Sequence, residues 1–79
     1  MPVPLTLYHR RGCHLCEQML AELRALHGNE LSIRMVDVDS DATLRARYGM
    51  EVPVLEAGEE ILSRGRLDRT QLEEYLARG

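Results

Sequence analysis

The sequence predicts an α/β fold in which a four-stranded mixed sheet carries helices on both faces, in the order β-α-β-α-β-β-α. Some segments alternate apolar and polar residues, which is typical of strands. Between them lie segments with an apolar residue every three or four positions, which is typical of helices. Glycine, proline and short polar runs mark the boundaries. The chain has 79 residues and no long polar tract, so we expect one domain over residues 1–79.

A first strand is expected over residues 3–8, where Val3, Leu5 and Leu7 occupy alternate positions. A helix is expected over residues 13–27, because apolar residues follow helical spacing there and Gly28 provides a C-terminal stop. The apolar positions of this helix are Leu15, Met19, Leu20, Leu23 and Leu26.

A second strand is expected over residues 31–38, which are rich in β-branched and other apolar residues. Asp39-Ser40-Asp41 then supplies N-cap oxygens for a shorter helix through Leu44 to Tyr48, which Gly49 ends. A strand, a helix and a strand of these lengths are typical of a right-handed crossover, so the first two strands should be parallel.

The second half of the chain predicts an antiparallel pair. Two short strands, residues 52–57 and 60–63, are joined by a tight turn at Gly58-Glu59. Asp68, with Gln71 three residues later, predicts the start of a last helix. The first strand would then lie centrally between the second and third, with the fourth at an edge, which is the minimal thioredoxin-like arrangement.

Charge and hydropathy exclude several classes of protein. Ten Lys and Arg residues against thirteen Asp and Glu residues give a net charge of −3, with the signs interspersed, which argues against a nucleic-acid-binding surface. The first residues lack the basic and apolar regions of a secretion signal, and no apolar run approaches the length of a membrane span. We therefore expect a cytoplasmic protein that does not bind membranes.

The segment 11–16, Arg-Gly-Cys-His-Leu-Cys, holds the only two cysteines, at the point where the first strand gives way to the first helix. A bridge across so short a loop removes little unfolded-state entropy, so the pair suits chemistry better than structural support. Unpaired N–H groups and the positive dipole end of the helix favour a thiolate at Cys13. We expect its pKa to fall from the free value of ~8.5 into the range ~3.5–7.5.

Cys16 lies nearly one helical turn after Cys13 and deeper, so Cys13 should attack a disulfide and Cys16 should resolve the mixed disulfide. A C-x-x-C motif also opens zinc and iron–sulfur sites. A closed zinc site takes four ligands, and only His9 and His14 accompany the two cysteines nearby. We favour redox chemistry with no bound metal, and a carrier that holds zinc or an iron–sulfur cluster between chains is the alternative.

A strand, a C-x-x-C motif at a helix start, a Val-Pro before a hairpin and a Gly-x-x-Asp before the last helix occur here in sequence. With these features the chain resembles the glutaredoxins over essentially its whole length, especially the short members, which include redoxins that supply electrons to ribonucleotide reductase. The resemblance implies a thiol–disulfide oxidoreductase whose nucleophile is Cys13 and whose resolving cysteine is Cys16. We expect a monomer with no tightly bound cofactor, an external reductant, and a protein disulfide or glutathione as partner.

The resemblance also implies roles for individual binding residues. Arg10 matches the basic residue near the glycyl carboxylate of glutathione. Pro53 matches the cis-proline beside the disulfide, and the backbone of Val52 would pair with the substrate in β-fashion. Gly65 and Asp68 lie where glutaredoxins receive the γ-glutamyl end of glutathione.

The chain departs from the usual glutaredoxin pattern at two places. His14-Leu15 stands between the cysteines in place of Pro-Tyr. Either an imidazolium at His14 favours the thiolate and makes the disulfide more oxidising, or His14 is a solvent-exposed residue of the first turn without effect on the cysteines. The segment Ser63-Arg64-Gly65-Arg66 replaces a Gly-Gly pair, and its two arginines would either hold a carboxylate of a partner or remain solvated, the reading we favour.

Two further sets of residues are assigned structural roles. Met19, Met35 and Met50 are expected to fill the core. Asp37 and Asp39, at the end of the second strand, are expected to cap the next helix.

Overall fold

The computed structural model describes residues 1–78, and its elements follow the predicted order β-α-β-α-β-β-α. Two 3₁₀ turns, Gly28–Glu30 and Val38–Ser40, flank the second strand. The strands and helices are β1 (Val3–His9), α1 (His14–His27), β2 (Leu31–Asp37), α2 (Ala42–Tyr48), β3 (Val54–Ala57), β4 (Glu60–Arg64) and α3 (Arg69–Arg78).

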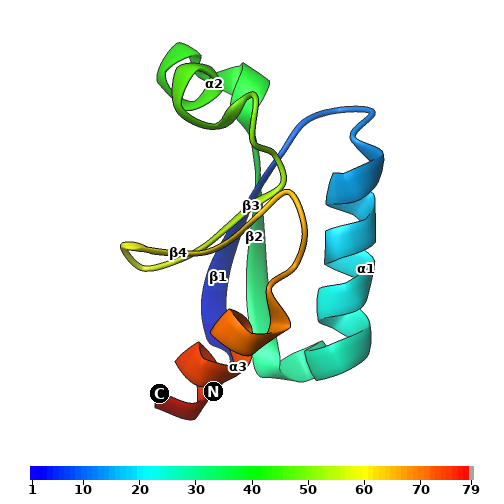
Figure 1. Ribbon diagram of the computed structural model, residues 1–79, viewed down its shortest axis with the longest axis vertical. Helices are drawn as coiled ribbons and strands as arrows, with labels where there is room; N and C mark the ends of the chain where they lie inside the picture. Colours follow the sequence, from blue (N-terminus) through cyan, green and yellow to red (C-terminus); the bar gives the residue numbers. More distant parts are fainter. Residues whose placement is uncertain (79) are drawn as a thin grey trace.

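The four strands form one mixed sheet in the order β2-β1-β3-β4, as predicted (Figure 1). β1 is parallel to β2, with His9 opposite Asp37, and antiparallel to β3, with Tyr8 opposite Val54. β3 is antiparallel to β4, with Val54 opposite Arg64. The ends of β1, β2 and β4 and the beginning of β3 therefore lie at one edge of the sheet. α1 starts from this edge, because a short loop joins it to β1.

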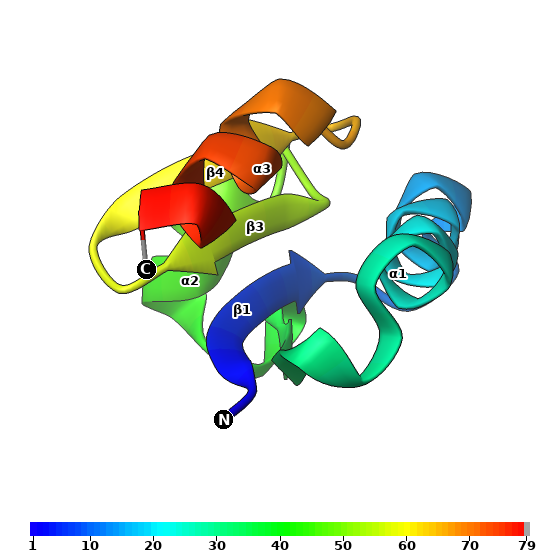
Figure 2. The same cartoon turned by 90° about the horizontal axis from the view of Figure 1, so that it is seen from below.

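Helices cover both faces of the sheet, as predicted, because successive strand residues point to opposite sides. α1 and α3 pack on one face and α2 packs at the end of the other (Figures 1 and 2). The larger cluster of buried residues, on the α1 and α3 side, comprises Leu5, Leu7, Met19, Leu23, Leu31, Leu55, Ala57, Leu62 and Leu72. The smaller cluster, on the α2 side, comprises Val38, Tyr48 and Val54.

The prediction that three methionines fill the core is right for one of them. Met19 is 1% exposed, whereas Met35 is 40% and Met50 98% exposed. Met50 lies in the loop between α2 and β3, and Met35 lies on the edge strand β2. Neighbouring elements enclose neither position, and the apolar character of a residue alone does not reveal this.

None of the helices within residues 1–78 combines the length and the apolar character that crossing a membrane requires.

Candidate active site

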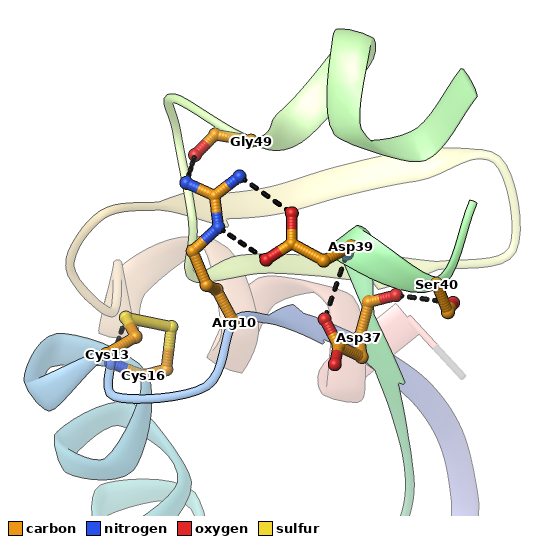
Figure 3. A network of polar contacts seen from close by, with 7 residues as sticks. All are labelled: Arg10, Cys13, Cys16, Asp37, Asp39, Ser40 and Gly49. Carbon is orange, nitrogen blue, oxygen red and sulfur yellow. Dashed lines mark hydrogen bonds and ion pairs between the residues drawn. A yellow bond between two sulfur atoms is a disulfide. The ribbon is translucent and has the colours of Figure 1, made fainter. Parts of the chain in front are cut away.

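Cys13 and Cys16 form a disulfide at the beginning of α1, and their Cα atoms are 5.2 Å apart (Figure 3). Cys13 is the N-cap residue of the helix and is partly exposed, whereas Cys16 lies inside the first turn and is 3% exposed. The two cysteines therefore form one disulfide pair but differ in exposure, as the sequence predicts.

A tight turn directs the chain from β1 into α1. The backbone N–H of Cys13 donates a hydrogen bond to the carbonyl of Arg10 at 3.2 Å, which closes the turn. Gly12 adopts a φ of 76°, in the left-handed region that favours glycine. This turn places Cys13 at the point where the first N–H groups of α1 have no partner within the helix.

The Cys13 sulfur occupies the position of an N-cap acceptor. The backbone N–H of Cys16 donates a hydrogen bond to Cys13 Sγ, with an N–S distance of 3.1 Å. In the reduced protein the same N–H and the positive end of the α1 dipole would stabilise negative charge on that sulfur. The local geometry thus suits a nucleophilic thiolate at Cys13.

Val52 and Pro53 lie at the same edge of the sheet, just before β3, and the bond between them is cis, as the resemblance implies. Pro53 is fully buried and Val52 is half-buried. β3 begins only at Val54, two residues later than predicted, because the ring of Pro53 leaves no N–H for the ladder. Within residues 1–78 the backbone N–H and carbonyl of Val52 make no backbone hydrogen bond.

Arg10 is held by a network that the sequence did not predict (Figure 3). Its guanidinium donates from Nε to Asp39 Oδ2 at 2.9 Å and from Nη2 to Asp39 Oδ1 at 3.0 Å. Its Nη1 donates to the carbonyl oxygen of Gly49 at 3.0 Å. We refer to Arg10, Asp39 and Gly49 as the Arg10 brace. It joins the β1–α1 loop to the turn after β2 and to the end of α2.

The ion pair of the brace shifts the pKa values of both partners. The hydrogen bonds from Arg10 hold the pKa of Asp39 below its usual value, and the same bonds raise the pKa of Arg10. The prediction that Asp39 caps the next helix is therefore wrong. Asp41 caps α2 instead, accepting from the N–H groups of Thr43 and Leu44 at 2.7 and 3.1 Å.

Asp37, which was predicted to cap the next helix, instead supports the turn that carries Asp39. Its Oδ1 accepts from the Asp39 N–H at 2.9 Å, which makes it the cap of the 3₁₀ turn Val38–Ser40. The separation of Arg10 from Asp39, 29 residues, explains why local sequence patterns gave no sign of their contact. The pairing of His9 with Asp37 across the sheet is what brings the two together.

The other two predicted binding residues lie after β4. Gly65 donates its N–H to the carbonyl of Pro53 at 2.8 Å, so it lies directly beside the Val52–Pro53 turn. Asp68 is exposed, and its carboxylate caps α3 by accepting from the N–H of Gln71 at 3.0 Å. His14 is exposed on the first turn of α1. The contacts of Gly65, Asp68 and His14 with a substrate remain predictions.

The described residues contain no group of three or more His, Cys, Asp or Glu side chains placed to hold a metal ion.

The family model described as "Glutaredoxin-like domain (DUF836)" matches residues 4–77 of the chain. The chain is similar to protein Ne2328 from Nitrosomonas europaea, which has a solution structure. The sequence identity is 35%, the match covers 95% of this chain and 92% of that chain, and the TM-score is 0.84. The X-ray structure of protein XcR50 from X. campestris is 33% identical over 95% of this chain and 97% of that chain, with a TM-score of 0.72. A search of curated proteins found no match.

A more distant structure shares the fold alone. Thioredoxin 1 from Thermosipho africanus TCF52B is 19% identical over 95% of this chain and 96% of that chain, with a TM-score of 0.60. The fold of the chain is thioredoxin-like, as the order of its elements predicts.

Proposed function

We propose that this chain, which belongs to the glutaredoxin-like domain family, is a thiol–disulfide oxidoreductase that works through Cys13 and Cys16. One observation carries the proposal. A partly exposed sulfur caps a helix and accepts a hydrogen bond from the backbone of Cys16, whose own sulfur is buried within bonding reach. This asymmetry matches what thiol–disulfide exchange needs from an attacking and a resolving cysteine.

The reaction uses two exchanges of sulfur bonds. The Cys13 thiolate attacks one sulfur of the substrate disulfide, a Cys13–substrate disulfide forms, and the second substrate sulfur leaves as a thiolate that takes a proton from solvent. The Cys16 thiolate then attacks Cys13 Sγ, releases the remaining substrate thiol and leaves the Cys13–Cys16 disulfide. The substrate gains two electrons and the protein loses two, and an external thiol reductant or a flavoprotein reductase restores the dithiol.

The Val52–Pro53 turn supports binding of an extended peptide beside the redox pair. The backbone N–H and carbonyl of Val52 are unpaired within the described residues, and they lie at the sheet edge from which α1 starts. Such groups can add a peptide in β-fashion. We propose that a protein disulfide or glutathione is the partner and that the protein acts as a cytoplasmic monomer without a bound cofactor.

Reduction of insulin and of a glutathione mixed disulfide, with a thiol reductant in excess, tests the proposal. We expect turnover with the natural chain and loss of turnover with Cys13→Ser, because the remaining cysteine, Cys16, is only 3% exposed and a substrate disulfide would not reach its sulfur. Undiminished turnover in Cys13→Ser would refute the assignment.

The alternative function, a carrier that holds zinc or an iron–sulfur cluster between chains through the same cysteines, makes a different prediction. It requires stoichiometric metal in protein purified without oxygen, together with slow thiol exchange. That pair of results would favour the carrier over the oxidoreductase.

A further inference from the structure

A groove lined by arginine side chains lies between β4 and the beginning of α3. It has a volume of about 620 Å³ and is formed by residues 61–64 and 66–70, from β4, the following loop and the beginning of α3. We call it the arginine groove. Arg64, Arg66 and Arg69 line it, and Asp68 is the one acidic residue in its lining.

The arginine groove continues toward the redox helix. A second hollow, of about 160 Å³, is formed by residues 65–67 together with side chains of α1. Arg66 and Leu67 line both hollows, so the two adjoin. On the α1 side the second hollow is lined by Leu15, which lies between the two cysteines and is 41% exposed. Arg66 and Leu67 therefore stand between the arginine groove and the first turn of α1.

Among the described residues, no side chain forms an ion pair with two of the three arginines. Arg64 pairs with Glu51 at 3.4 Å, whereas the guanidinium groups of Arg66 and Arg69 make no ion pair or hydrogen bond within residues 1–78. The carboxylate of Asp68 is used in capping α3. Arg10 is already bound to Asp39 and Gly49 in the Arg10 brace. The groove thus presents positive charge on a protein whose net charge is −3.

The backbone leads from the substrate-pairing turn into the groove. The backbone N–H of Gly65 donates a hydrogen bond to the carbonyl of Pro53, and Arg66 is the next residue of the chain. A peptide paired with Val52 would advance about 3.3 Å per residue along this edge. Residues a few positions from its cysteine would therefore reach Arg66.

We propose that the arginine groove binds acidic residues that flank the target disulfide of a protein partner. The proposal rests on thiol–disulfide exchange at Cys13 and names the class of substrate for it. Guanidinium groups match carboxylates in a fixed bidentate geometry, and a positive groove attracts an acidic segment before contact. Arg66 belongs to a loop and Arg69 to α3, and both line the same groove, so an acidic segment with more than one carboxylate would engage both arginines.

Two synthetic disulfide-bonded peptides test the proposal. They have equal length and differ only in carrying Glu and Asp, or Gln and Asn, next to the cysteines. The measurement is the ratio of kcat/KM for the acidic peptide to that for the neutral one. We expect a ratio of about three to ten for the natural chain at low salt, falling toward one at high salt.

Substitutions of Arg66 and Arg69 test whether the preference for the acidic peptide depends on the arginine groove. In the double variant Arg66→Gln and Arg69→Gln the ratio should fall toward one, and in Arg66→Glu with Arg69→Glu it should fall below one, because the groove then repels acidic residues. Arg34→Gln is the matched control, since Arg34 is an exposed arginine on β2, outside both hollows, and it should keep the natural ratio.

A ratio near one in the natural chain, or an unchanged ratio in both double variants, would overturn the proposal while leaving the redox function intact. Reduction of neither peptide would instead overturn the redox function, and this proposal with it. Each variant is compared on two peptides in the same sample, so a partly unfolded variant does not alter the ratio.

Discussion

At the scale of single residues, Cys13 and Cys16 have the same side chain but different surroundings. Cys13 ends a turn and caps α1, which leaves its sulfur partly exposed and in contact with the backbone N–H of Cys16. Cys16 points into the apolar interior and is 3% exposed. We therefore expect the two sulfurs of the reduced protein to differ in reactivity, because negative charge would be stabilised at Cys13 and desolvated at Cys16.

Tyr8 is a second residue whose surroundings change its chemistry. Its ring packs against Tyr48 with centroids 4.6 Å apart, and its hydroxyl donates to Glu56 Oε1 at 2.9 Å. Burial, followed by the hydrogen bond to Glu56, raises the pKa of Tyr8 to about 12. An unfolded tyrosine titrates near pH ~10.

This shift predicts a loss of stability at alkaline pH. Between about pH 10 and pH 12 the unfolded chain releases the Tyr8 proton and the folded chain keeps it, so unfolding becomes easier as pH rises. The stabilisation is complete below about pH 10. Urea unfolding of the oxidised protein should show a larger fall in unfolding free energy between about pH 9 and pH 11.5 for the natural chain than for Tyr8→Phe. Equal losses in both proteins would contradict the account.

At the scale of secondary-structure elements, the Arg10 brace fixes the loop before the redox pair against α2. Gly49 is essential to its geometry, because a Cβ atom there would lie 2.5 Å from the carbonyl oxygen of Arg45 and 3.0 Å from Arg10 Nη2. Both distances are too short for an ordinary contact, so a side chain must displace α2 or the guanidinium.

Gly49→Ala should therefore lower the unfolding free energy by about 1–3 kcal/mol, the usual cost of overpacking. The measurement is urea unfolding at neutral pH. Met50→Ala is the control at the next position, where the side chain is 98% exposed, and it should change stability by less than about 0.5 kcal/mol. Equal stability of the two variants would show that the brace tolerates a side chain at residue 49.

The sequence predicted the elements well because each carries its own local pattern. The helix after the cysteines, for example, was recognised from apolar spacing and ended at Gly28, close to its observed limits His14–His27. The role of Asp39 was missed, because contact with Arg10 depends on the register of two strands that are distant in the chain. The exposure of Met50 was missed for a similar reason, since apolar character does not reveal what covers a loop.

At the scale of the whole molecule, α1 and α3 cover one face of the sheet, and α2 covers part of the other face. A chain of 79 residues has a small core, so each buried side chain contributes a large share of the net stability. Leu23 and Leu26 allow this to be tested within one helix, because they are 0% and 37% exposed.

Leu23→Ala should lower the unfolding free energy by about 2–5 kcal/mol, since it leaves a cavity between α1 and the sheet. Leu26→Ala should cost clearly less, because its side chain is already in contact with water. Thermal or urea unfolding of both variants, in the same redox state, makes the comparison. A smaller loss for Leu23→Ala than for Leu26→Ala would contradict the described packing of α1.

The overall topology could be predicted because a parallel crossover and a hairpin leave few ways to build one sheet. That topology also brought Cys13, Val52 and Pro53 to one edge, as expected from the sequence. The sequence raised a carboxylate-binding role for Arg64 and Arg66 but favoured solvated side chains, and it indicated neither Arg69 nor a groove. The arginine groove depends on the path of the loop from Arg64 to Asp68, which no repeating pattern specifies.

The central claim, that Cys13 attacks and Cys16 resolves, is tested most directly by trapping the mixed disulfide. Reduced Cys16→Ser and Cys13→Ser proteins are each mixed with a disulfide-bonded peptide, quenched with acid and analysed by mass spectrometry. We expect Cys16→Ser to accumulate the peptide on Cys13 and Cys13→Ser to remain unmodified on the same timescale. Faster trapping on Cys16 than on Cys13 would contradict the account.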